Sequence, residues 1–281
     1  MSIKVVDYRA ANAAQQFAAG LRDIGFAVIA NHPVNQELIE KNYEVWGDFF
    51  RSPESEKLKF EFDTKKHDGF ASVALSETAK GYDKKDLKEF YHFYTWGRCP
   101  EHLRPVTLQL YSELNIFAET LLQWIEQNAP QDIQDNLSIP LSDMIKGSKR
   151  TLFRMIHYPP LRGNEPLGAV RAAPHGDINL LTVLPAATAE GLQVKDSQGR
   201  WIEVPINPNW IIVNIGDMLQ ECTQGYYPST QHRVMNPTGE AAKKSRLSMP
   251  LFLHPLDDVQ LSSRYTAESY RLERYKELGL L

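Results

Sequence analysis

One segment constrains this chain more than any other. His175 and Asp177 lie two residues apart and are followed directly by the apolar run 178–184. In an extended strand, residues i and i+2 project to the same face, so we expect the imidazole and the carboxylate to lie side by side on one strand. At the head of an apolar strand they would lie at the rim of a sheet, where a pocket can open. Such a triplet alone is weak evidence, because it also arises by chance.

A third candidate, His232, follows in the segment 225–234. Two histidines and one carboxylate form the facial triad that holds Fe(II) and leaves coordination positions open. His232 alone would be an equally weak signal. The combination, on successive expected β elements, predicts a metal site formed by His175, Asp177 and His232.

Arg246 and Ser248 repeat the i, i+2 spacing further along the chain. An arginine fork and a hydroxyl group on one face of a strand suit a small carboxylate ligand. We expect Arg246 to face an otherwise apolar pocket wall made by its neighbours Leu247, Met249 and Leu251.

The composition is that of an ordinary folded protein. The 281 residues are 42% apolar and 23% charged, and the net charge is −4, which gives no electrostatic footprint for nucleic acid. Two cysteines offer neither a disulfide framework nor a zinc pattern. The first residues lack an apolar signal core, and no run approaches a membrane span. We therefore expect a soluble cytoplasmic protein that acts on a small molecule, with no nucleic-acid and no membrane partner.

The amino-terminal half has mainly helical periodicity. The pattern predicts a short strand at 3–6, a helix over 10–24 ended by Gly25, a buried strand at 26–30, a helix from about Asn35 and a long helix over 106–127. Residues 63–82 have no clean period, and we expect irregular surface there, as in a lid or substrate loop.

The texture changes at residue 152. Short apolar runs separated by Pro, Gly and Asn predict an antiparallel sandwich or barrel, and residues 266–278 return to helical character. The expected strands lie at 152–157, 178–184, 192–194, 201–204, 210–214, 232–234 and 246–254. Without repeats or low-complexity linkers, we expect helices that wrap one β core.

The remaining candidate side chains have simpler interpretations. His254 is expected to end a strand rather than to bind iron, and Asp217 to serve a turn or cap. His157, beside Tyr158, is a candidate to face the pocket.

Together these motifs resemble the isopenicillin N synthase-like branch of the Fe(II)/2-oxoglutarate-dependent oxygenases. The resemblance covers nearly the whole chain and includes Gly25-Phe26, Phe49-Phe50-x-x-Pro53, the segments 86–90, 191–194 and 214–217, the run from Gly225 to Val234, and Arg246-x-Ser248.

The resemblance implies a mixed α and β fold, in which a double-stranded β-helix (jelly roll) is flanked by N-terminal helices and a C-terminal helix. It implies a non-haem dioxygenase N-terminal region at 1–145, a catalytic core at 150–255 and a helical tail at 256–281. His175, Asp177 and His232 would bind Fe(II), and Arg246, Ser248 and Tyr158 would hold 2-oxoglutarate. With O2, such an enzyme oxidises a small organic substrate, typically by hydroxylation, and releases succinate and CO2. No catalytic residue beyond the iron ligands is implied.

Two departures and several alternatives stay open. The family's Asn-His-Gly turn ends in Pro33 here, and Ile156 replaces a common polar residue that contacts the cosubstrate. An iron oxidase of the same family that does not use 2-oxoglutarate is compatible with the motifs. A catalytically silent metal-binding module fits less well, as do a cupin-like isomerase and a zinc hydrolase. The substrate would be set by the segment 63–94 and the C-terminal tail. Because both histidines must be neutral to bind a metal, we expect affinity to fall below about pH 6.

Overall fold

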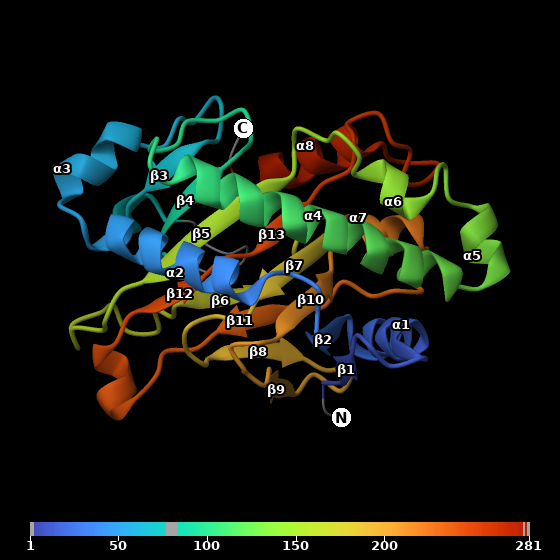
Figure 1. Ribbon diagram of the computed structural model, residues 1–281, viewed down its shortest axis with the longest axis horizontal. Helices are drawn as coiled ribbons and strands as arrows, with labels where there is room; N and C mark the ends of the chain where they lie inside the picture. The colour runs from blue at the N-terminus through green and yellow to red at the C-terminus, as the bar shows by residue number, and fades with distance from the viewer. Residues whose placement is uncertain (1–2, 77–83, 278, 280–281) are drawn as a thin grey trace.

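Two β-sheets pack face to face in the computed structural model, which describes residues 3–76, 84–277 and 279 (Figure 1). The larger sheet runs in the order β1 (Val5–Asp7), β2 (Phe26–Ala30), β10 (Ile211–Ile215), β7 (Leu181–Pro185), β13 (Leu251–Leu253), β5 (Leu152–Tyr158), β4 (Glu89–Phe93) and β3 (Gly69–Ala71), with β12 (Arg246–Ser248) also paired to β5. The smaller sheet has the order β6 (Ala172–His175), β11 (His232–Val234), β8 (Leu192–Lys195) and β9 (Trp201–Glu203). Only the β1–β2 pair, among the described strands, is parallel.

Helices cover the outer face of the larger sheet, and Figure 1 shows α4 crossing it. The long helices are α1 (Ala13–Ile24), α2 (Gln36–Arg51) and α4 (Arg104–Gln127); α8 (Ala267–Glu277) lies near the C-terminus. Shorter helices are α3 (Glu54–Lys57), α5 (Gln131–Asp135), α6 (Leu141–Met144), α7 (Asp217–Cys222) and the 3-10 turns η1 (Leu58–Phe60), η2 (Val73–Leu75) and η3 (Gly239–Lys243). None of the helices in the described part of the chain is long and apolar enough to cross a membrane.

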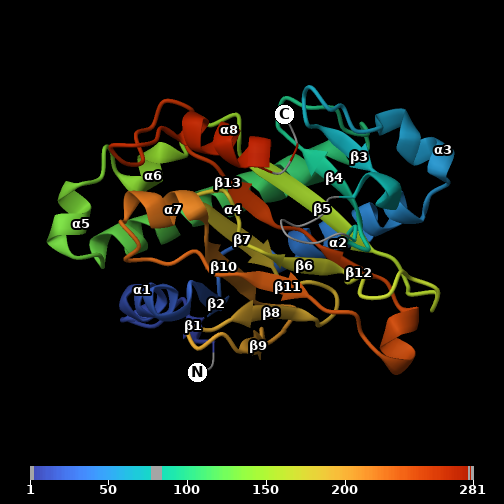
Figure 2. The same ribbon diagram turned by 180° about the vertical axis from the view of Figure 1, so that it is seen from behind.

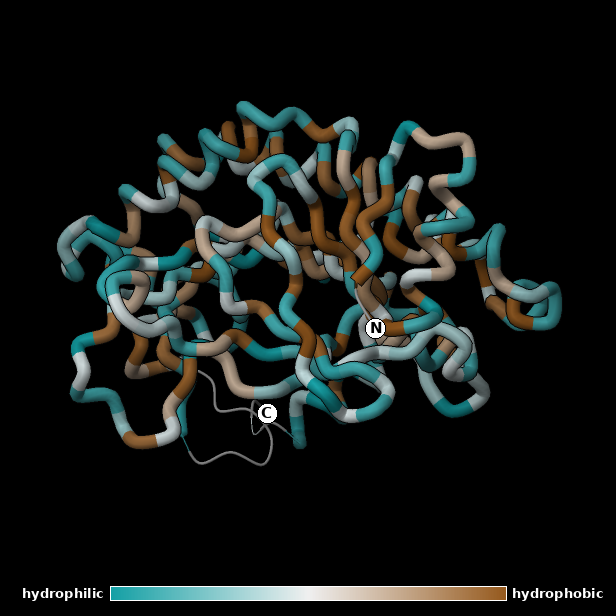
Figure 3. Tube along the Cα trace, turned by 90° about the horizontal axis from the view of Figure 1, so that it is seen from below, coloured by the Kyte–Doolittle hydropathy of each residue, from teal (hydrophilic) through white to brown (hydrophobic). Residues whose placement is uncertain are grey.

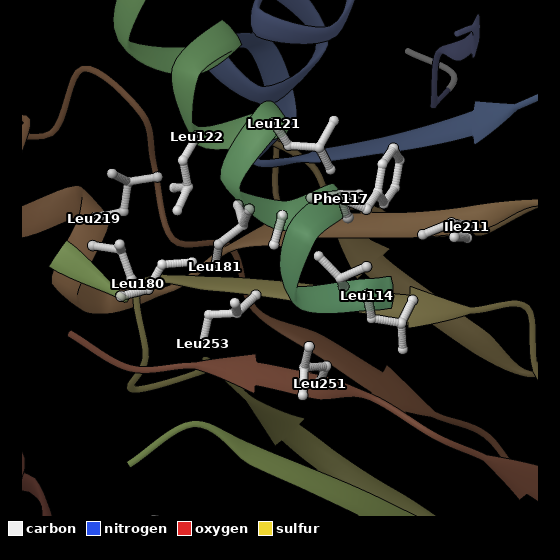
Figure 4. Close-up of a cluster of buried hydrophobic side chains, with 14 of the residues drawn as sticks. Leu114, Phe117, Leu121, Leu122, Leu180, Leu181, Ile211, Leu219, Leu251 and Leu253 are labelled. Atoms are coloured by element: carbon white, nitrogen blue, oxygen red, sulfur yellow. The ribbon is translucent and has the colours of Figure 1, made fainter. Parts of the chain in front are cut away.

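The main core lies between α4 and the larger sheet. Figure 4 shows Leu114, Phe117 and Leu121 of α4, spaced at helical turns, pointing at leucines of β7 and β13 such as Leu181 and Leu251. All of these side chains are buried. In Figure 3 the most hydrophobic segments gather inside the molecule and the hydrophilic ones lie mainly at its periphery.

A second apolar cluster lies between the two sheets. The side chains of β5 alternate: Phe153 and Met155 face the helices, whereas Ile156 and Tyr158 belong to the inner cluster. That inner cluster also takes residues from β8 and β11 of the smaller sheet, including Val194 and Val234. Residues of both sheets therefore line the space between them, and Figure 2 shows the two sheets from behind.

Local signals set several element boundaries as expected. Asn35 caps α2, since its side-chain oxygen accepts hydrogen bonds from the backbone N–H groups of Glu37 and Leu38. Gly25 ends α1 with φ of 71°, and its N–H donates to the Leu21 carbonyl at 2.7 Å. The expected mixed α and β fold with a jelly-roll core is confirmed.

Some local expectations are wrong. His175 and Asp177 do not share a strand, because β6 ends at His175 and β7 begins at Leu181. Asp177 lies in the connection between two strands of different sheets. The short strand β6 and the helices α5, α6 and α7 were not expected from the periodicity. Residues 63–82, expected to be irregular, contain the strand β3 and the turn η2, and their last part, from 77 onward, lies outside the described residues.

Candidate metal and cosubstrate site

The three predicted ligands come together between the sheets. One ligand atom each from His175, Asp177 and His232 can be chosen so that all lie within 4.8 Å of one another. His175 and His232 are direct cross-strand partners on β6 and β11, and their ring centres are 4.4 Å apart. Asp177 reaches the same point from the β6–β7 connection, with its Oδ1 3.6 Å from His232 Nε2.

Backbone carbonyls orient both imidazole rings. His175 Nδ1 lies 2.8 Å from the Ala173 carbonyl oxygen, and His232 Nδ1 lies 3.2 Å from that of Thr230. A carbonyl oxygen only accepts, so Nδ1 carries a proton in each ring, and Nε2 is the nitrogen that remains to face a metal. A metal-binding histidine is expected to make such a hydrogen bond with the ring nitrogen that does not face the metal.

Two neighbours hold the Asp177 carboxylate. Its Oδ2 accepts hydrogen bonds from the Thr182 hydroxyl at 2.6 Å and from the Asn214 amide at 2.8 Å, which leaves Oδ1 for a metal. Thr182 and Asn214 face each other across β7 and β10. Neither residue was expected to have a role, although each is an isolated polar residue in an otherwise apolar strand, which is the signal that could have identified them.

The charges of the site match those of metal ligands. Burial, and after it the neighbouring His232, lower the pKa of the His175 imidazole to about 4, so the ring is neutral near pH 7. For Asp177, burial opposes ionisation, but the two imidazoles and the hydrogen bonds from Thr182 and Asn214 outweigh it and lower the pKa of the carboxyl group. Two imidazole nitrogens and one carboxylate are the donor set that suits a non-haem Fe(II) ion.

The predicted cosubstrate residues lie together on two paired strands. Arg246 pairs with Tyr158, and Ser248 pairs with Ile156, across β12 and β5. Arg246, Ser248 and Tyr158 are all buried. The Arg246 Nε donates to the Ala189 carbonyl oxygen at 2.9 Å, whereas its Nη1 is buried without a hydrogen-bond partner among the described residues.

The pocket beside Arg246 is lined mainly by apolar residues, with Glu190 also in its wall, and its walls differ from those expected. They come from β7, β8, β10 and nearby loops, with lining residues that include Leu184, Ala187, Leu192, Val204 and Ile212. Met249 and Leu251 pack in the outer core instead. Alternation along the strand places every second residue on the helix-covered face, which is why sequence neighbours of Arg246 do not line its pocket.

Three other candidates lie outside the ligand set. His157 does not face the pocket, since its Nδ1 lies 2.7 Å from Glu89 Oε1 and its ring stacks on Phe50 of α2. His254 follows the last residue of β13, as expected. Asp217 begins α7 and donates its backbone N–H to the Asp177 carbonyl oxygen at 2.7 Å.

A two-histidine, one-carboxylate centre enclosed by a jelly roll defines a non-haem iron oxygenase. The comparisons agree: the model of the 2OG-Fe(II) oxygenase superfamily matches residues 150–255, and that of the N-terminal region of non-haem dioxygenases in morphine synthesis matches residues 3–109.

Individual relatives support the same family. The chain is 32% identical to Protein DMR6-LIKE OXYGENASE 2 of Arabidopsis thaliana, over 88% of this chain and 69% of that protein. It is 27% identical to a flavonol synthase/flavanone 3-hydroxylase of Matthiola incana, over 84% of this chain and 79% of the relative. The crystal structure of a putative oxygenase from Shewanella oneidensis covers 100% of both chains at 50% identity, with a TM-score of 0.90.

The chain belongs to the 2OG-Fe(II) oxygenase superfamily. It is an Fe(II)- and 2-oxoglutarate-dependent dioxygenase.

Proposed function

We propose that this enzyme hydroxylates a small organic substrate at an Fe(II) ion held by His175, Asp177 and His232. The observation that carries the proposal is the convergence of these three ligand atoms within 4.8 Å, with their other polar atoms already hydrogen-bonded. When bound, the iron supplies O2 activation coupled to oxidative decarboxylation of 2-oxoglutarate, which releases succinate and CO2. The chain contributes ligand geometry, cosubstrate orientation and exclusion of water.

Arg246, Ser248 and Tyr158 are proposed to receive the distal carboxylate of 2-oxoglutarate. A guanidinium group presents its donors in a planar fork that matches a carboxylate. The unpartnered Nη1 of Arg246 and the buried hydroxyl groups of Ser248 and Tyr158 are suited to this contact. The apolar walls around Arg246 would keep water away and so strengthen it.

The substrate end of the site is proposed to involve the segment 63–94 and α8. His67 stacks on Tyr275 of α8 at 5.6 Å, which joins the two segments. Phe90 of β4 is the cross-strand partner of Ile156 of β5, and the His92 ring stacks on the Phe90 ring. Both rings therefore lie on the inner face of the larger sheet, as Ile156 does. The matched flavonol synthase/flavanone 3-hydroxylase is named for a small organic substrate, and the aromatic residues of β4 suit a substrate of that size.

We also propose that the regions 1–145, 150–255 and 256–281 serve as an N-terminal dioxygenase region, a catalytic core and a substrate-side tail. The finer assignment to the isopenicillin N synthase-like branch stays a prediction, as does the cytoplasmic location.

The test is succinate formation. Anaerobically purified protein is given Fe(II), 2-oxoglutarate and O2, and wild type is compared with His175→Ala. We expect slow succinate release from the wild type, even without added substrate, and none from the variant, because it lacks one iron ligand. Wild type that binds iron yet forms no succinate, even when a panel of small organic substrates is added, would favour the oxidase that does not use 2-oxoglutarate. Failure to bind iron would refute the proposed site.

A further inference from the structure

Two arginine side chains are buried beside Tyr158. Arg246 is 2% exposed, and Arg171, which directly precedes β6, is 1% exposed. Their guanidinium carbons lie 5.1 Å and 5.9 Å, respectively, from the centre of the Tyr158 ring. Tyr158 is also buried, so the three side chains form one cluster, which we call the arginine–tyrosine cluster. It lies where β12, the end of β5 and the start of β6 meet (Figure 2).

Neither guanidinium group of this cluster has its donors satisfied. Arg171 Nη2 donates to the Lys244 carbonyl oxygen at 3.0 Å, and Arg171 Nε is buried without a partner in the described part of the chain. Arg246 shows the same pattern, with one bond to the Ala189 carbonyl oxygen and an unpartnered Nη1. The hydrogen-bond partners of both are uncharged, namely backbone carbonyl groups and, for Arg246, the Tyr158 side chain, and no acidic side chain among residues 3–76, 84–277 and 279 forms an ion pair with either.

Two like charges are thus held together away from water. Burial, and after it the charge of Arg246, lower the pKa of the Arg171 guanidinium. A buried charge costs several kcal/mol unless it is paired, so two adjacent buried cations without an acid call for an anionic ligand. One carboxylate offers about four acceptor sites, enough for more than one arginine.

The backbone holds Arg171 in place for such a role. Its N–H donates to the Asn236 side-chain oxygen at 2.9 Å, and the amide of Asn236 donates to the Ala169 carbonyl oxygen at 2.8 Å. Asn236 therefore clamps the segment that leads into β6 and its iron-ligand candidate His175. Arg171 is thus held at two points. Its backbone N–H is bonded to Asn236, and its guanidinium group is bonded to the carbonyl oxygen of Lys244.

We propose that Arg171 is a positioning residue of the 2-oxoglutarate pocket. Packed against Tyr158, it fixes that ring and adds a second buried positive charge at the end of the pocket that receives the distal carboxylate. This inference rests on the proposed function. It implies that Arg171 favours a 2-oxo dicarboxylate over a 2-oxo acid that lacks the distal carboxylate.

The test compares two ligands that differ only at the distal end. Full-length protein loaded with Mn(II), which replaces iron without turnover, is titrated calorimetrically with 2-oxoglutarate and with 2-oxopentanoate. Arg171→Gln keeps a donor for the Lys244 carbonyl but removes the charge. We expect the Kd for 2-oxoglutarate to rise on the order of tenfold in this variant, while the Kd values for 2-oxopentanoate and for Mn(II) stay as in wild type.

Two further variants sharpen the comparison. Arg171→Lys keeps the charge but loses the planar group, so we expect a smaller loss of 2-oxoglutarate affinity, and this variant replaces Arg171→Gln if the latter does not fold. Arg264→Gln is the matched control, because Arg264 also stacks on a tyrosine, Tyr265, but is largely exposed to solvent. It should bind both ligands as wild type does.

Equal binding of 2-oxoglutarate by wild type and Arg171→Gln would overturn the inference. An equal loss for both ligands would also overturn it, since it would indicate a structural role without regard to the distal carboxylate. Wild type that binds Mn(II) but not 2-oxoglutarate would instead refute the proposed function on which the inference rests.

Discussion

Asp177 has the most demanding position of the three proposed metal ligands, because it projects from a connection rather than from a strand. Thr182 and Asn214 compensate by fixing one carboxylate oxygen through two hydrogen bonds. Contacts of this kind determine which oxygen faces the metal and how basic it is. The precision of the site therefore depends on residues that do not touch the metal.

Thr182→Val keeps the shape of the side chain and removes its hydroxyl group. We expect metal affinity to fall by about tenfold or more, the range known for residues that orient metal ligands, with secondary structure retained. Calorimetric titration with Mn(II) measures the affinity, and Thr120→Val on α4 is the control. Unchanged affinity in Thr182→Val would show that Asn214 alone orients the carboxylate.

Arg246→Lys retains a positive charge but loses the planar fork. We expect a raised requirement for 2-oxoglutarate, read from the concentration that gives half-maximal succinate release. The metal affinity should not change, because Arg246 is not a ligand. A requirement equal to that of wild type would contradict the assignment of Arg246 to the cosubstrate.

Among the secondary-structure elements, the junction of β10 and α7 supports the connection that carries Asp177. Gly216 lies between these two elements, and its N–H donates to the Leu180 carbonyl oxygen at 3.1 Å. A side chain at Gly216 would overlap the carbonyl oxygen of Asn179. The close approach of these two backbone segments is what requires glycine at this position.

Gly216→Ala should therefore displace the connection 176–180. We expect destabilisation of about 1 to 3 kcal/mol, as for other overpacked positions, together with weaker metal binding. Urea unfolding and Mn(II) titration measure the two effects. Gly20→Ala, inside α1, is the matched control, because a Cβ there would lie an ordinary 3.5 Å from the Cβ of Lys4. Its stability should be equal to or above that of wild type. Wild-type stability and metal affinity in Gly216→Ala would contradict the steric argument.

In the molecule as a whole, the larger sheet separates two kinds of core. The outer core between the sheet and α4 is apolar, whereas on the other side of the sheet titratable side chains are buried, among them Asp177, His232 and Arg246. Burial, and after it the charge of Arg271, lower the pKa of His254 to about 4, and that of His175 falls to a similar value. Unfolding raises both toward the ordinary histidine pKa near 6.5.

This difference makes the metal-free protein sensitive to acid. Between pH 6.5 and about 4 the unfolded chain binds protons that the folded chain does not, so stability falls as the pH drops. The free energy of unfolding is measured for wild type and for His254→Gln at pH 7 and at pH 5, with a chelator present. We expect its decrease between these two pH values to be about 1 to 2 kcal/mol smaller in His254→Gln than in wild type. His102→Gln, at an exposed position, is the control. Parallel pH profiles for wild type and His254→Gln would refute this account.

The low pKa of His175 also changes the expected pH range of metal binding. The sequence predicted a loss of affinity below about pH 6. Since burial keeps His175 neutral to lower pH, the loss due to this ligand is expected nearer its pKa of about 4.

Much of the fold and the site could be predicted from the sequence, because the relevant signals are local. The spacing of apolar residues located α4, Asn35 and Gly25 marked helix ends, and short apolar runs located most strands of the carboxyl-terminal half. The identity and order of His175, Asp177 and His232 predicted a metal site, and the structure brings one ligand atom from each within 4.8 Å of the others. These features depend on residue type and short-range backbone geometry alone.

Only the tertiary structure decided which distant residues become neighbours. Asn214 reaches Asp177 because β10 pairs with β7 in one particular register, and a shift of one residue would turn it to the other face. Arg171 reaches Tyr158 only because the two sheets approach each other at the start of β6. Periodicity along a strand does not specify its partner or register across the molecule, so the residues that support the ligands had to come from the assembled fold.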